Sequence, residues 1–147
     1  MENNLKEDSL MHGKIIGAQL PSPAALAYIG DARHSLYIRK MLVSRGITKS
    51  GELNSRSLEY VTAEAQAEAY GRIEPKLTED ELDVFRRAHN STHLNKPKHA
   101  SGKAYRTATG FEAVIGMLTW IGDEERLEEL LAIAINENGG TASDTED

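Results

Sequence analysis

The chain contains no cysteine among its 147 residues. This absence excludes a disulfide framework, a thiolate zinc site and a cysteine nucleophile, so any bound metal must use oxygen or imidazole ligands. Long apolar runs are also missing. The longest, residues 111–121, is interrupted by Glu112 and Gly116 and is shorter than the roughly 20 residues that cross a bilayer. Residues 1–8 are mixed and charged and show no signal peptide, so we expect a cytoplasmic protein with no membrane partner.

Positively charged residues are fewer than negatively charged ones. With 17 Lys and Arg against 23 Asp and Glu, the chain carries −6, which taken as a whole argues against a nucleic-acid partner. The charges are unevenly placed, however. Residues 86–106, here called the basic run, hold six bases and no acid, whereas residues 123–147 hold nine acids and one base. The six bases are Arg86, Arg87, Lys96, Lys98, Lys103 and Arg106.

The basic run contains Asn90, Asn95, Pro97 and Gly102, which interrupt helical periodicity. We therefore predict a long exposed loop. One interpretation is a solvated loop whose charge has no role. The other is a phosphate-binding loop, because loops longer than about 12 residues are uncommon in compact domains unless they are functional or disordered.

Cap and turn signals divide the chain into five predicted helices. Ser22 and Pro23 predict the start of the first, which runs to residue 45. An Ala-rich zone spans residues 53–70 and ends at Gly71, a capping box of Thr78 and Glu81 opens a helix to about residue 87, and further helices cover residues 105–121 and 123–138. No segment alternates like a strand, so we predict an all-α fold, with residues 21–137 as one domain, 1–20 as an extension and 138–147 as a disordered acidic tail.

Two acids stand inside helices that are otherwise apolar. The first predicted helix is apolar almost all round, which is typical of a buried helix, yet Asp31 lies in its middle. Glu112 interrupts the fourth helix in the same way. The residues one turn away are small: Ala27 and Ser35 for Asp31, and Ala108 and Gly116 for Glu112.

Burying an unpaired carboxylate costs several kcal/mol, so such an acid is protonated, paired with a base or bound to a metal. A structural salt bridge to Arg33, Arg39 or Arg106 is one explanation. Two such acids on separate helices favour a site for Mg²⁺, with Mn²⁺ as a substitute, because these ions take carboxylate, water and phosphate oxygens. Together with the basic run, the pattern predicts metal-dependent hydrolysis of phosphodiester bonds.

Several short elements, taken together and in order, resemble the Mini-ribonuclease III family. They are LAYIGDA (26–32), LYIR (36–39) and YRTATGFEAVIG (105–116), with ITK (47–49), QA (66–67), RR (86–87) and PK (97–98). The resemblance implies an all-α ribonuclease III-type catalytic domain, homodimeric and Mg²⁺-dependent, that cuts double-stranded RNA and lacks a separate RNA-binding domain. It further implies a role in maturing the large-subunit ribosomal RNA precursor, and contact with a ribosomal protein is part of the same expectation.

By position, Asp31 and Glu112 match the metal-binding, catalytic acids of the ribonuclease III domain. Full-length enzymes of this type carry another Glu and another Asp where this chain has Ala27 and Thr109. The resemblance therefore implies a site with fewer protein ligands. No Ser, Cys or His nucleophile is needed, because a metal-activated water would attack.

Two further stretches depart from the family pattern. Residues 33–35, Arg-His-Ser, replace the apolar-apolar-Glu that commonly follows Gly-Asp-Ala. Residues 88–92 read Ala-His-Asn-Ser-Thr where Gly-Arg-Asn-Ala-Lys is usual. The loss of two positive charges predicts RNA binding that is weaker, or that depends on pH near the His pKa of about 6.5.

Three aromatic residues, Tyr28, Tyr37 and Trp120, lie in apolar helices and are expected to pack in the core or a dimer interface.

Two other functions are compatible with the sequence. The first is a dimeric RNA-binding module of the same fold without activity. The second is an all-α nucleotide pyrophosphohydrolase, for which Glu64 and Glu68 are the one pair of Glu at helical spacing.

Overall fold

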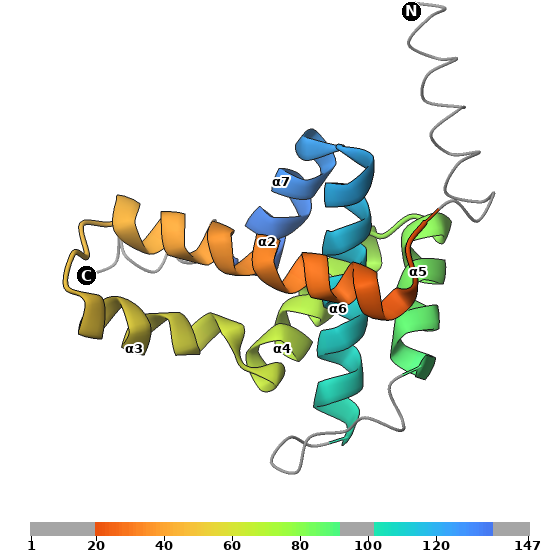
Figure 1. Ribbon diagram of the computed structural model, residues 1–147, viewed down its shortest axis with the longest axis horizontal. Coiled ribbons are helices and arrows are strands. Elements are labelled where there is room, and N and C mark those ends of the chain that lie inside the picture. Colours follow the sequence, from red (N-terminus) through yellow and green to blue (C-terminus); the bar gives the residue numbers. More distant parts are fainter. Residues whose placement is uncertain (1–19, 92–101, 137–147) are drawn as a thin grey trace, which may run out of the picture.

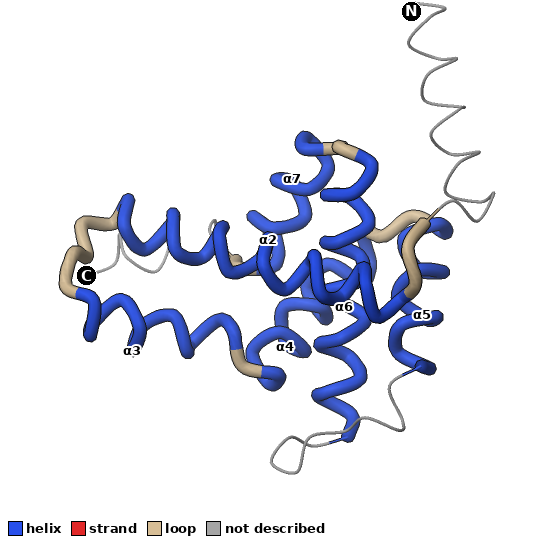
Figure 2. The backbone as a smooth tube through the Cα atoms, viewed as in Figure 1, coloured by secondary structure: helices blue, strands red, loops and turns tan. Residues whose placement is uncertain are grey.

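The structure, a computed structural model, describes residues 20–91 and 102–136, and within these ranges every regular element is a helix (Figures 1 and 2). The elements are α2 (Pro23–Ser44), α3 (Ser50–Val61), α4 (Ala63–Ile73), the short 3₁₀ helix η1 (Glu74–Lys76), α5 (Glu79–Ser91), α6 (Gly102–Ile121) and α7 (Glu124–Ala134). The predicted all-α fold is confirmed. Most of the predicted extension and tail, and Lys96 and Lys98 of the basic run, lie outside the described residues.

Side-chain caps explain where several helices begin. The Ser22 hydroxyl accepts from the Ala25 N–H at 3.2 Å, with Pro23 at the first helical position. The capping box is formed as predicted: the Glu81 N–H donates to the Thr78 hydroxyl at 3.2 Å, and the Thr78 N–H donates to the Glu81 carboxylate at 2.9 Å. These contacts satisfy N–H groups that have no partner within their own helix.

Several predicted helix boundaries are wrong. The zone at residues 53–70 is not one helix, because Thr62 adopts an extended conformation and caps a new helix by accepting from the Ala65 N–H. Gly71 lies inside α4 and does not end it. The last helix stops at Ala134, well before the predicted glycines, because Asn136 takes a left-handed conformation with φ of 57°.

Helix α6 is the centre of the fold. It packs against α2, α4, α5 and α7, and its run from Phe111 to Leu118 is almost entirely buried. The crossing with α2 is unusually close: a Cβ on Gly30 would overlap the Glu112 carbonyl, and a Cβ on Gly116 would overlap the Leu26 carbonyl. The two glycines therefore let the backbones of α2 and α6 touch.

Helix α2 is not buried on every side, contrary to the prediction. Its core face carries His34 and Ile38, together with Leu26, Ala27, Gly30, Met41 and Leu42. The opposite face is also apolar, and there Leu36 is 51% and Val43 57% exposed, with Ala32 also exposed. An apolar pattern all round a helix can thus reflect a second partner as well as a protein core.

Beyond the core, α2 continues as one arm of a hairpin with α3, and the two helices lie side by side (Figure 1). Ile38, Met41 and Leu42 form a small separate apolar cluster there with side chains that include Leu53 and Tyr60. None of the described helices is long and apolar enough to cross a membrane.

Ion pairs attach α7 to the rest of the molecule. Arg33 on α2 reaches Glu124 at 3.3 Å and Glu128 at 3.1 Å. Arg126 on α7 donates to the buried Glu81 carboxylate at 2.7 Å. Glu124 and Glu128 of α7 are therefore paired within the fold.

Candidate active site

The α2–α6 crossing brings Asp31 and Glu112 together. Asp31 follows Gly30 directly, and the Gly30 Cα lies against the Glu112 backbone carbonyl, so the two acids meet where the helices touch. The Glu112 side chain is within hydrogen-bonding range of Asp31. Asp31 is exposed and Glu112 is partly buried, so the pair opens to solvent on the Asp31 side. The sequence prediction that both acids belong to one cluster matches this geometry.

The electrostatics of the pair follow from this arrangement. Burial, followed by the hydrogen bond and the negative charge of Asp31, raises the pKa of Glu112 to about 8, although Gln66 acts in the opposite direction. A pKa of about 8 favours the protonated form of Glu112 at neutral pH when no cation is bound. A bound cation would favour the ionised form of both carboxylates.

Structural salt bridges do not account for these acids. The ion pairs found in residues 20–91 and 102–136 include neither Asp31 nor Glu112. Arg33, one of the bases considered as a partner, is engaged by Glu124 and Glu128 instead. The paired-base explanation is therefore wrong for Arg33.

The donor set fits a hard divalent cation with few protein ligands. Two carboxylates converge, and among the residues the structure covers no group of three or more His, Cys, Asp or Glu side chains could hold a metal ion. Mg²⁺ is commonly held by one or two carboxylates, with water and substrate phosphates filling its other positions. Ala27 and Thr109 have no carboxylate to add. Ala27 is buried, and the Thr109 hydroxyl donates to the Tyr105 carbonyl at 2.9 Å.

Two residues at the site were given no role by the sequence. Gln66 on α4 is 2% exposed, and its side chain reaches the Glu112 carboxyl. His34 on α2 is 1% exposed, and its Nδ1 lies 3.4 Å from the Gln66 Nε2. The sequence signal for Gln66 was its polar side chain in an Ala-rich helix, and this signal does not indicate which residues Gln66 contacts.

The basic run is largely helical where it is described, which corrects the predicted loop. Arg86 and Arg87 lie exposed on α5, and Lys103 and Arg106 lie in the first turns of α6. The helix continues past residue 87 because residues 88–91 keep helical hydrogen bonding, with Ala88 fully buried against the core. Arg87 also pairs with Asp83 at 3.0 Å.

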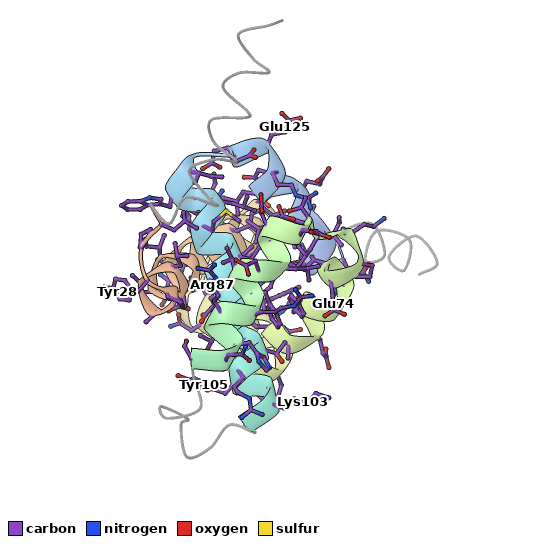
Figure 3. The ribbon with its side chains drawn as sticks, turned by 90° about the vertical axis from the view of Figure 1, so that its right-hand side faces the viewer. Tyr28, Glu74, Arg87, Lys103, Tyr105 and Glu125 are labelled. Carbon is purple, nitrogen blue, oxygen red and sulfur yellow. The ribbon has the colours of Figure 1, made fainter. Side chains whose placement is uncertain are left out.

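Charge is separated in space as well as in sequence. Lys103 lies at the lower end of α6 in Figure 3, and Glu125, on the acidic helix α7, lies at the upper end. A helix of 20 residues is about 30 Å long, so α6 holds Lys103 well apart from Glu125. Negative charge on α7 is therefore far from the bases at the other end.

Comparison with known proteins identifies the class to which this fold and site belong. Residues 24–122 match the model of the Ribonuclease III domain. A crystal structure of a Fusobacterium nucleatum protein superimposes with a TM-score of 0.72 at 30% identity, covering 80% of this chain and 93% of that one. The chain thus has a ribonuclease III-type fold.

Curated relatives give the narrower family. Mini-ribonuclease 3 of Thermoanaerobacter sp. is 43% identical over 114 residues, which is 78% of this chain and 80% of the relative. Mini-ribonuclease 3 of Streptococcus pneumoniae is 39% identical over 128 residues, covering 86% of this chain and 100% of the relative. The chain belongs to the Mini-ribonuclease 3 family and is a ribonuclease of the endonuclease type.

Proposed function

We propose that the protein is a Mg²⁺-dependent endoribonuclease that cuts double-stranded RNA, with Asp31 and Glu112 as its catalytic and metal-binding residues. The observation that carries the proposal is the convergence of these two carboxylates at the solvent-facing edge of the α2–α6 crossing. Mg²⁺ is the expected ion and Mn²⁺ a substitute, since both accept oxygen ligands. The family membership supports the same reaction.

The chain's own groups have defined tasks in this mechanism. Asp31 and Glu112 would hold Mg²⁺, which would supply an activated water and neutralise charge on the phosphate. Asp31, being exposed, faces the substrate side, while the partly buried Glu112 is held by its neighbours. Burial and Asp31 raise the pKa of Glu112 to about 8, so Glu112 would have to release a proton in order to hold the cation.

RNA binding is assigned to the bases of the basic run. Arg86, Arg87, Lys103 and Arg106 are available on α5 and α6, and Lys96 and Lys98 belong to the segment between these helices (Figure 3 labels Arg87 and Lys103). A duplex would be read through its backbone and 2′-hydroxyls, so sequence preference should be modest. Binding should weaken steeply as salt increases, because phosphate contacts release counterions.

A homodimer is proposed from the exposed apolar stripe of α2. Tyr28 is 82% exposed and projects from α2 in Figure 3, and Leu36 and Val43 follow on the same face. Stripes of this kind mark interaction surfaces. Tyr28 therefore fits the predicted interface, whereas Tyr37 is partly buried against the core. Replacing Leu36 by Lys should shift the protein toward monomers in sedimentation analysis, with Leu58→Lys, an exposed change on α3, as the control.

The decisive test is cleavage of long double-stranded RNA with Mg²⁺ or with EDTA. The parent protein should cut only with Mg²⁺, Asp31→Asn should lose at least about 100-fold in rate, and Glu68→Gln, an exposed change on α4, should behave like the parent. An Asp31→Asn variant that folds and cuts at the parent rate would refute the site. RNA binding without any Mg²⁺-dependent cleavage would favour the non-catalytic binding module.

Maturation of the large-subunit ribosomal RNA precursor is the proposed biological role, and contact with a ribosomal protein stays a prediction. Incubation with a precursor transcript should yield cuts at a defined duplex. The pyrophosphohydrolase alternative gains no support, because Glu64 and Glu68 are exposed on α4 and belong to no group of three or more potential ligands in the described chain.

A further inference from the structure

Beneath the two acids lies a buried polar pair that the proposed mechanism does not use. Gln66 and His34 are 2% and 1% exposed, and they come from α4 and α2. Buried polar side chains are costly unless they are hydrogen-bonded, so each needs a partner. They find one in each other, with 3.4 Å between the Gln66 Nε2 and the His34 Nδ1.

The pair is connected directly to Glu112. The Gln66 side chain reaches the Glu112 carboxyl, so one buried amide lies between a carboxylate and an imidazole. An amide nitrogen has two N–H groups, so the Gln66 amide can donate to both partners. His34 must then accept at Nδ1, which requires the neutral ring with its proton on Nε2.

The position of the His34 ring is itself defined by packing. Its edge meets Phe111 in a T-shaped contact, with ring centroids 5.3 Å apart and an interplanar angle of 83°. Phe111 is fully buried and precedes Glu112 on α6. Burial lowers the pKa of His34 to about 4, against the raising effect of Asp31, which is consistent with a neutral ring.

We propose that Gln66, held by His34, is a positioning residue that orients the Glu112 carboxylate toward the position where the divalent cation binds. The inference rests on the proposed function. The His34 ring fixes the Gln66 amide, and the amide prevents Glu112 from turning wholly toward Asp31. Groups that orient a metal-binding carboxylate typically change metal affinity or activity by about 10- to 100-fold when they are removed.

Gln66→Met tests the amide, since methionine has similar length and no N–H. We expect Mn²⁺ binding, measured by electron paramagnetic resonance without RNA, to weaken about 10-fold or more, and kcat for RNA cleavage to fall while KM changes little. Ile73→Val, another buried change on α4, serves as the control for general loss of packing and should leave Mn²⁺ binding unchanged.

His34 is tested by a matched pair. His34→Leu removes the acceptor and should weaken Mn²⁺ binding as Gln66→Met does. His34→Asn places an oxygen near the former Nδ1 and should restore affinity to within about threefold of the parent. In the parent protein, ¹⁵N spectra of the imidazole at neutral pH should show the Nε2–H tautomer, a feature that packing alone does not require.

The outcomes separate this inference from the proposed function. Mn²⁺ binding and kcat that survive Gln66→Met would overturn the inference alone. If His34→Leu and His34→Asn fold and lose Mn²⁺ affinity equally, His34 acts only through packing, and the proposed role of His34 in holding Gln66 is overturned. A parent protein that neither binds Mn²⁺ nor cuts RNA would overturn the proposed function and this inference with it.

Discussion

Replacing Glu112 by Gln should abolish activity and yet stabilise the metal-free protein at high pH. Burial and the adjacent Asp31 raise the pKa of Glu112 from 4.5 to about 8 in the folded state. In the unfolded chain this carboxyl ionises near pH 4.5, so between pH 4.5 and about 8 the folded state binds one more proton than the unfolded state does. Stability of the metal-free parent should therefore fall as the pH rises from about 5 to 9.

The magnitude has an upper bound. The difference between 4.5 and about 8 corresponds to roughly 5 kcal/mol at most. Because Asp31 is exposed and Glu112 only partly buried, solvent screening lowers the expected effect to about 2 kcal/mol. Glutamine resembles the protonated acid, so the variant should match the parent near pH 5 and exceed it by this amount near pH 9.

Urea unfolding in EDTA, followed by circular dichroism at several pH values, measures the effect. Glu68→Gln removes an exposed carboxylate from α4 and provides the charge-matched control. Added Mg²⁺ should stabilise the parent at pH 8 and the Glu112→Gln variant much less. If the difference in free energy of unfolding between the variant and the parent is the same at pH 9 as at pH 5, the raised pKa of Glu112 is refuted.

Three other predictions follow from the packing and the charges. Gly30→Ala should cost about 3 kcal/mol and reduce activity with it, because the added methyl meets the Glu112 carbonyl; urea unfolding that matches the parent would contradict the close crossing. Glu81→Gln keeps the capping box but removes a carboxylate whose pKa is lowered in the fold, because the Arg126 guanidinium and the Thr78 N–H together outweigh the effect of burial; the variant should lose about 2 kcal/mol at pH 7, and this loss should shrink as the pH falls below the unfolded pKa of 4.5 and through the lower folded pKa, as urea unfolding at several pH values would show. Arg86→Ala should weaken RNA binding and lower the slope of log K against log salt by about 1, as measured by filter binding, whereas Arg56→Ala on α3 should leave the slope unchanged.

Local signals in the sequence predicted the beginnings of helices better than their ends. Ser22, the capping box at Thr78 and the cap at Asp123 all form the expected contacts, because a cap uses neighbours within three or four residues. The break at Thr62 was missed, since a threonine that caps a helix looks the same in sequence as one inside it. The continuation of α5 to Ser91 depends on Ala88 packing in the core, which is a long-range contact.

The opposite sides of α2 show what an apolar pattern leaves open. Leu36 and Val43 are apolar and yet exposed, while the polar His34 faces the core. Periodicity indicates which residues share a face but not which face meets the rest of the molecule. That choice depends on where α6 lies, and the two glycines at the crossing set it.

The sequence by itself determined the helical fold and the separation of charge along the chain, and it singled out Asp31 and Glu112 as candidate site residues. Each rests on composition, capping or motif, which are properties of neighbouring residues. Only the tertiary structure decided that burial and Asp31 raise the pKa of Glu112, and that Gln66 and His34 lie beneath the two acids. These properties depend on burial and on distances between α2, α4 and α6, because pKa values and hydrogen bonds respond to what surrounds a group in space.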